Sequence, residues 1–145
     1  MNISSDNVSL FKDDKMDICT HENNLDRTKE FIKYFSFINK FGIIHTNKYY
    51  VKCNLALLTF HNKLTLSKYI FNVPEDFEKI QALGINYINY YPNIYHQYNV
   101  SRNNKLIILF GTTIINNITY NIVSNIVVSF KNNLPKIIDH CLFIM

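Results

Sequence analysis

Residues 85–145 consist almost entirely of segments with the composition of β-strands, and this limits the folds open to the chain. Isoleucine, valine and tyrosine, which favour strands, recur there in four segments separated by short turns rich in asparagine. Consecutive strands joined by short turns pair as an antiparallel meander. The predicted strands cover residues 85–98, 105–115, 118–131 and 136–145.

The first half of the chain contains helical patterns instead. Between Leu25 and Phe41 apolar residues recur at steps of three and four with charged residues between them, which predicts an amphipathic helix that Gly42 ends. Helices followed by a run of strands indicate an α+β fold. The other predicted elements are a short helix or turn over 43–50, a hairpin of strands 55–60 and 63–67, and a helix over 74–83.

Length and composition favour one domain that needs no cross-link. The 145 residues, of which 48% are hydrophobic, suffice for a core of its own. We expect residues 1–23, which are polar and lack a period, to form a mobile leader, and residues 24–145 to form the domain. The three cysteines lie far apart, so neither a metal site nor a disulfide framework is predicted. No apolar run has the length of a signal peptide or a membrane span, so we expect a location in cytoplasm or nucleus.

The net charge of +4 is unevenly distributed. Residues 1–30 contain four basic and seven acidic side chains, whereas Asp139 is the only acid after Glu78. The basic residues of that second part are spread along the sequence, and nucleic-acid binders concentrate theirs on one face or helix. Direct RNA binding is therefore not predicted. These basic residues are Lys79, Arg102, Lys105, Lys131 and Lys136.

Several short motifs, in this order, resemble the nuclear transport factor 2 (NTF2-like) superfamily. They are Tyr49-Tyr50, LALLTFHN at 55–62, PEDFEKIQALG at 74–84, His96-Gln97, LIILFG at 106–111, the strand 122–130, and KIIDHCLF at 136–143. Phe60 and Ser124 replace the tryptophan and the glutamine of the family pattern. The resemblance implies a cone of three N-terminal helices packed on a strongly curved antiparallel sheet.

Two branches of that superfamily differ in their partners. The branch that imports GDP-bound Ran as a homodimer presents acidic residues, and the matching positions here, Phe60-His61 and the turn 115–118, carry none. Ran is therefore not the expected partner. The segment 136–141 resembles the mRNA export cofactor, which implies a non-enzymatic heterodimer with the NTF2-like domain of an mRNA export receptor. It also implies contact with phenylalanine-glycine repeats of nucleoporins and shuttling between nucleus and cytoplasm.

A sheet that helices cover on one side must expose its other side. A long sheet rich in tyrosine and isoleucine then presents an apolar patch, which is typical of a partner surface. The predicted interface residues are Tyr91, Tyr95 and Gln97 of one strand, Tyr120, Ile122, Ser124, Ile126 and Val128 of another, and Phe143 of the last.

An enzyme of the same fold is the third alternative. Isomerases and dehydratases need a base and a proton donor inside the cone. The candidates are Asp139, His96 or His140 as base and Tyr50 or Tyr91 as donor. Asp139 and His140 are neighbours on one strand and must face opposite sides, so the set is incomplete. The sequence predicts no catalytic residue, cofactor or metal.

Overall fold

The computed structural model describes residues 18–61 and 65–145. The chain divides into two compact units, Met1–Tyr34 and Phe35–Met145. Helix α1, Ile18–Asn39, begins in the first unit and ends in the second. Most of the expected leader lies outside the described residues, but residues 18–23 are helical, so α1 includes residues before the predicted start at Leu25. The predicted domain of residues 24–145 stays a prediction.

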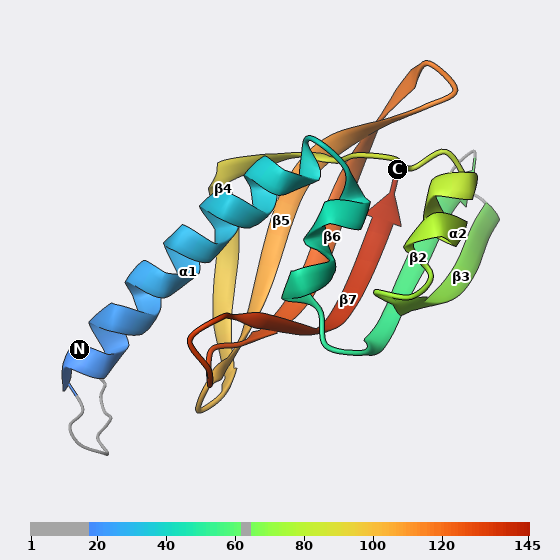
Figure 1. Cartoon of the computed structure of the whole chain (residues 1–145). Helices are drawn as coiled ribbons and strands as arrows, with labels where there is room; N and C mark the ends of the chain where they lie inside the picture. Colours follow the sequence, from blue (N-terminus) through green and yellow to red (C-terminus); the bar gives the residue numbers. More distant parts are fainter. Residues whose placement is uncertain (1–17, 62–64) are drawn as a thin grey trace. The chain divides into compact units, whose positions relative to one another are not determined.

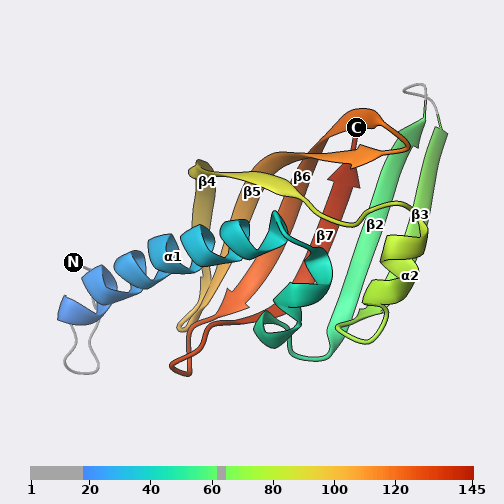
Figure 2. The same ribbon diagram turned by 45° about the horizontal axis from the view of Figure 1, so that its top comes forward.

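The second unit contains a six-stranded sheet in the order β3-β2-β7-β6-β5-β4 (Figures 1 and 2). The expected α+β class is confirmed, and so is the antiparallel meander of the last four strands. The strands are β2 (Cys53–His61), β3 (Thr65–Val73), β4 (Asn89–Ser101), β5 (Asn104–Ile115), β6 (Ile118–Ser129) and β7 (Lys136–Ile144).

The expectation of a wholly antiparallel sheet is wrong. Strands β2 and β7 pair in parallel, with Leu55 opposite His140 and Thr59 opposite Ile144. The chain leaves the β2–β3 hairpin through α2 (Phe77–Ala82) and crosses to the far edge of the sheet, where β4 begins (Figure 1). Strands β5, β6 and β7 then follow one another back across the sheet, so that β7 pairs with β2. Patterns within single strands do not specify this contact between segments far apart in the sequence.

Short helices cover one face of the sheet, called here the inner face. These are the last turn of α1, the 3-10 helix η1 (Ile43–Tyr49), and α2 (Figure 2). Phe35 stacks on Tyr90 of β4 at 5.8 Å between ring centroids, and Phe77 of α2 meets Tyr50 at 5.4 Å. Phe77 and Ile80 are buried as the helical pattern of α2 predicts, whereas Leu83 is 40% exposed beyond the end of that helix.

Irregular pairing bends the sheet. The β4–β5 register shifts between Tyr90 and Tyr95, and the β6–β7 register shifts between Val127 and Val128. Such bulges increase the local bend and twist of a strand. At the first shift the β4 backbone lies so close to Gly111 that a Cβ atom there would be 2.4 Å from the carbonyl oxygen of Asn89. Glycine therefore permits the close approach of the two strands.

The β5–β6 turn has the geometry that its two asparagines predict. Asn116 and Asn117 have φ angles of 52° and 65°, a left-handed conformation that asparagine tolerates better than most residues. Two successive positive φ values are typical of the tight turns that match the twist of paired strands. This turn fixes the register of the longest ladder in the sheet, which runs from Asn104–Ser129 to Ile115–Ile118.

Candidate functional site

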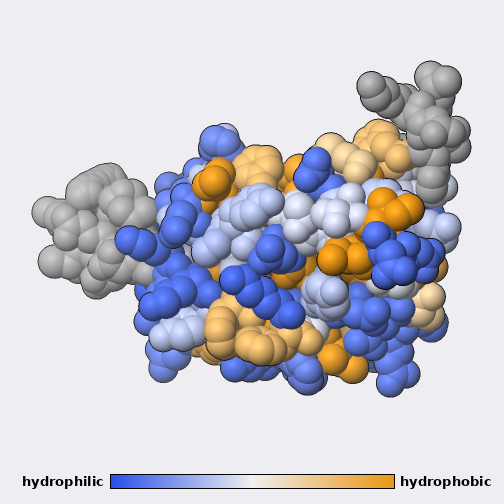
Figure 3. Space-filling view, turned by 90° about the horizontal axis from the view of Figure 1, so that it is seen from above, coloured by the Kyte–Doolittle hydropathy of each residue, from blue (hydrophilic) through white to orange (hydrophobic). Residues whose placement is uncertain are grey.

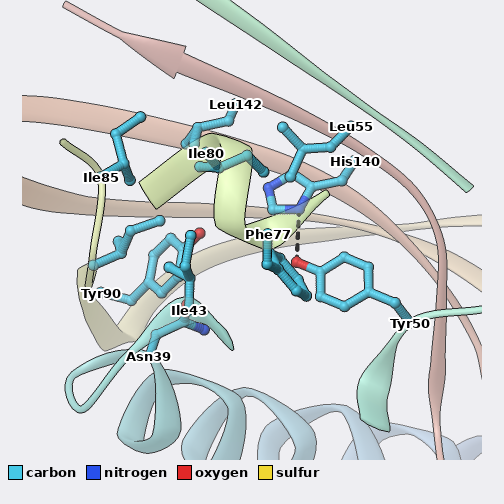
Figure 4. A pocket seen from close by; sticks show the side chains of 11 residues that line it. Asn39, Ile43, Tyr50, Leu55, Phe77, Ile80, Ile85, Tyr90, His140 and Leu142 are labelled. Atoms are coloured by element: carbon cyan, nitrogen blue, oxygen red, sulfur yellow. Dashed lines mark hydrogen bonds between the residues drawn. The ribbon is translucent and has the colours of Figure 1, made fainter. Parts of the chain in front are cut away.

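A chain of hydrogen bonds crosses the core beneath η1 and α2, and Figure 4 shows its first contact, between Tyr50 and His140. The Tyr50 hydroxyl lies 3.0 Å from Nδ1 of His140, and Nε2 of His140 lies 3.0 Å from Oγ of Ser124. The Ser124 hydroxyl lies 2.7 Å from the Tyr90 hydroxyl. All four residues are buried, and His140 is only 2% exposed. Buried polar groups without partners are costly, so these four depend on one another.

The inner-face positions of adjacent strands bring these residues together. His140 of β7 is opposite Ile126 of β6, and Ser124 lies two residues from Ile126 on the same face. Tyr90 of β4 reaches over Gly111, its partner on β5. Tyr50 follows η1 and forms a bridge to Ile137, which places its ring parallel to that of His140 at 6.0 Å between centroids.

The neutral imidazole of His140 has a partner at both ring nitrogens. In one tautomer Nδ1 accepts from Tyr50 and Nε2 donates to Ser124; in the other Nδ1 donates to Tyr50 and Nε2 accepts from Ser124. Either tautomer leaves no nitrogen of the buried ring without a hydrogen bond.

Burial keeps this network uncharged. Desolvation lowers the pKa of His140 to about 3, so the imidazole is neutral at physiological pH. Desolvation also raises the pKa of Tyr50 and of Tyr90 well above the usual value for tyrosine. None of the three groups changes its charge near neutral pH.

The cavity beside this hydrogen-bond network is nearly filled by side chains. Its volume is about 10 Å³, and apolar side chains such as Ile80, Ile85 and Leu142 surround it (Figure 4). A cavity of that size holds about one water molecule. His140 and Tyr50, two of the candidates for an enzymatic base and donor, are therefore adjacent and lie beside this cavity, which has no room for a substrate. Asp139 is exposed on the other side of β7, as the alternation predicts.

The opposite, helix-free face of the sheet, called here the outer face, is lined mainly by apolar side chains. Cross-strand pairing arranges them in rows. One row contains Lys68, Leu58, Phe143, Val123 and Phe110, and the next contains Ile70, Ala56, Cys141, Asn125, Ile108 and His96. A third contains Asp139, Val127, Leu106 and Tyr98. The view in Figure 3 shows a different surface, where apolar groups alternate with polar ones.

Most of the predicted interface residues do not lie on this outer face. Ile122, Ser124, Ile126 and Val128 are buried on the inner face, so the predicted orientation of β6 is wrong. The physical reason is that both faces of β6 carry β-branched residues, and a shift of one residue exchanges the faces. The outward residues of β6 are Val123, Asn125 and Val127.

The predicted interface residues of β4 also lie on the face opposite to the one expected. Tyr95 and Gln97 are opposite the buried Leu109 and Ile107, so they belong to the inner side. Tyr91 is exposed within the irregular stretch after Tyr90. Tyr120 is half-buried opposite Thr113, also on the inner side, and Phe143 lies on the outer face as predicted.

Asn125 is the polar residue at the middle of the outer face. It lies between Ile108 of β5 and Cys141 of β7. Its Oδ1 atom is buried and has no hydrogen-bond partner among the described residues. An unsatisfied buried acceptor is unfavourable.

Other chemical sites are not visible in the described residues. No group of three or more histidine, cysteine or acidic side chains there could hold a metal ion. Cys53 and Cys141 are free thiols, and burial raises the pKa of each, which disfavours the reactive thiolate. Within the same residues, no helix is long and apolar enough to cross a bilayer.

Fold and site together define a small α+β domain with a curved mixed sheet, a closed core and an exposed apolar sheet face. The chain matches no known family model and no solved structure. It is 30% identical over 145 residues to the uncharacterized protein L295 of Acanthamoeba polyphaga mimivirus, and the alignment covers 94% of the chain and 72% of that protein. The chain belongs to the same family as this mimivirus protein.

Proposed function

We propose that the chain is a non-enzymatic transport cofactor that binds a protein partner through the outer face of its sheet. The partner is the NTF2-like domain of an mRNA export receptor, and the pair supports mRNA export through nuclear pores. The single observation that carries the binding role is the set of apolar rows on the outer face, which none of the described helices covers. Exposure of such an apolar surface to water is unfavourable.

The outer face has a size suited to a protein partner. Six strands spaced about 4.8 Å apart and three rows of side chains give a footprint of roughly 600 Å². A standard protein interface buries about 800 Å² on each partner, so this face with its rim is sufficient. A broad apolar sheet face also fits a second sheet better than it fits a small ligand.

The choice of partner rests on the resemblance to the NTF2-like superfamily. The implied order of elements, namely a helix, a short helix, a hairpin, a helix and four strands, is present in the chain. The cavity beside Tyr50 and His140 is too small for a substrate, which favours this role over an enzyme that uses those two residues.

Co-expression with the NTF2-like domain of an mRNA export receptor tests the proposal. We expect a 1:1 complex in size-exclusion chromatography with light scattering, and Val123→Lys should abolish it by placing a charge among Phe143, Phe110 and Asn125. Ile118→Lys is the control, because Ile118 is also apolar and is more exposed than Val123, but lies at the β5–β6 turn. The control should bind normally.

Three outcomes would overturn this assignment. If the chain stays monomeric in the presence of the receptor domain, or if the Val123→Lys variant still forms the complex, the outer face is not the binding surface. A stable homodimer that retains GDP-loaded Ran on a column would indicate the import branch instead.

A further inference from the structure

Three segments converge at the end of the sheet where β4 begins, in the upper part of Figure 1. The backbone N–H of Ile88 donates to the Asn39 carbonyl oxygen at 3.0 Å, which holds the end of α1 against the segment that leads into β4. Thr113 Oγ1 of β5 donates to the Tyr87 carbonyl oxygen at 2.8 Å, which joins the β5–β6 hairpin to the same segment. Hydrogen bonds therefore fix the three segments to one another.

A cleft of about 360 Å³, called here the edge cleft, lies where these segments meet. All of its lining residues belong to the second unit. Sites for small molecules typically have volumes of roughly 300–1,000 Å³, so the edge cleft can hold a small ligand, unlike the cavity beside His140. Besides Thr113, the residues that line it are Lys40, Tyr87, Asn89, Thr112, Ile114 and Thr119.

Strand pairing places four of these residues on one face of the sheet. Asn89 is opposite Thr112, and Thr119 is opposite Ile114, which lies two residues further along β5. Strand β5 continues to Ile115, whereas its pairing with β4 begins only at Asn89. The β5–β6 hairpin thus contributes a wall of the cleft that β4 does not cover.

The edge cleft is separate from the apolar rows of the outer face, which the protein partner is proposed to cover. The row next to that of Phe110 is polar, and it contains Asn89, Thr112 and Asn121. The apolar surface therefore ends at Phe110, and the cleft lies beyond that limit. Lys40 and Tyr87 precede β4 in the sequence and belong to none of the rows.

The lining residues offer hydrogen-bonding groups and one positive charge. Lys40 is exposed, takes part in no ion pair among the described residues, and is accompanied by no acidic residue in the lining. A lysine ammonium binds phosphate as a point charge. Thr112 and Thr119 supply hydroxyl groups and Asn89 an amide, all of which can donate to and accept from the hydroxyls of a sugar. Tyr87, 42% exposed, adds apolar surface that a sugar ring can cover.

We propose that the edge cleft binds a sugar phosphate, with Lys40 at the phosphate and with Asn89 and Thr112 at the sugar hydroxyls. The ligand is a free sugar phosphate or the ribose phosphate of a mononucleotide, because both present the same groups. A neutral sugar would not need the cation, and a triphosphate would need more than one. This role goes beyond the proposed function, because it requires no protein partner and uses none of the apolar rows.

Titration of the nitrogen-15-labelled chain with ribose 5-phosphate, followed by amide NMR, tests the site. We expect saturable shifts at residues 40, 87–89, 112–114 and 119, with a dissociation constant below about 1 mM. Ribose and inorganic phosphate each carry only one of the two recognised parts and should bind at least roughly tenfold more weakly. Adenosine monophosphate distinguishes the two sources: tighter binding than that of ribose 5-phosphate would assign the cleft to a nucleotide, and weaker binding to a free sugar phosphate.

Two substitutions separate the recognition of the phosphate from that of the sugar. Lys40→Gln should weaken binding of ribose 5-phosphate roughly tenfold and leave that of ribose unchanged. Lys131→Gln, the matched control at an exposed lysine beyond the other end of β6, should have no effect. Thr112→Val should weaken the binding of both ligands, whereas Thr112→Ser, which keeps the hydroxyl, should bind them normally. The amide spectrum of each variant verifies that it is folded.

Absence of saturable shifts at about 10 mM ribose 5-phosphate would overturn the site, and so would shifts confined to residues outside the cleft. Equal effects of Lys40→Gln and Lys131→Gln, or equal affinity for inorganic phosphate and ribose 5-phosphate, would mean that charge alone attracts the ligand and would overturn it as well. Failure of the receptor complex has no bearing on these titrations, since they use the chain alone.

Discussion

The hydroxyl of Tyr50 lies 3.0 Å from Nδ1 of His140, and the two rings are parallel to within 5°. Both residues are buried, and the pair continues through Ser124 to Tyr90. A neutral imidazole in the core therefore has a partner at each nitrogen, and the stability of the second unit depends on both contacts.

Acid should destabilise the protein through His140. Its pKa of about 3 in the folded state lies below the usual value of 6.5, so between pH 6.5 and 3 only the unfolded chain takes up this proton. The free energy of unfolding should then fall by about 1.4 kcal/mol per pH unit as pH decreases through that window. Urea denaturation at several pH values measures it. His140→Gln should lose this part of the slope, and His96→Gln, on the outer face, should retain it.

The two tyrosines of the network should differ in their contribution. Tyr50→Phe leaves Nδ1 of the buried His140 without a hydrogen-bond partner, which costs about 1–3 kcal/mol, whereas after Tyr90→Phe the Ser124 hydroxyl keeps Nε2 of His140 as a partner, so the cost should be about 1 kcal/mol or less. Chemical denaturation compares the two variants. Equal losses of stability in the two variants would contradict this difference.

The close approach of β4 and β5 should make Gly111 irreplaceable. In Gly111→Ala the new Cβ would lie 2.4 Å from the Asn89 oxygen, a backbone atom that cannot move without the strand, so we expect a loss of about 1–3 kcal/mol. Gly42→Ala is the control, because its nearest neighbour is the His45 side chain at 3.1 Å, which can rotate away. Similar melting temperatures for the two variants would contradict this packing.

Truncation of two neighbouring residues of β6 should destabilise the protein to different extents. Ile126 is 0% exposed, so Ile126→Ala should cost about 2–5 kcal/mol, whereas Val127 is half-buried on the outer face and Val127→Ala should cost about 1 kcal/mol or less. Thermal unfolding ranks the two. The reverse ranking would mean that β6 has the register predicted from its sequence.

The sequence predicted the elements better than their orientation. The asparagine turns marked the ends of the last four strands, and the helical spacing of Phe77 and Ile80 marked the buried side of α2. The face of β6 was not predictable, because Ile122 and Ile126 alternate with the equally apolar Val123 and Val127. Alternation identifies an inner face only when the other face is polar.

The candidate site was predicted only in fragments. His140 and Tyr50 were recognised as residues able to exchange a proton, and the separation of Asp139 from His140 on β7 is confirmed. Ser124 and Tyr90 were not connected with them, because their meeting depends on the order of strands in the sheet. One signal was present: Ser124 is a lone hydroxyl among isoleucines and valines, where a partner is required.

The parallel contact of β2 with β7 has a consequence for how the protein acquires its structure. The β2–β3 hairpin is joined to the rest of the sheet only through β7, and Leu55 is separated from its partner His140 by most of the second unit. On the ribosome, the hairpin must wait with an unpaired edge until β7 emerges, and closing so long a loop is slow. Pairing of β7 with β2 therefore completes the sheet and leaves only β3 and β4 as its edge strands.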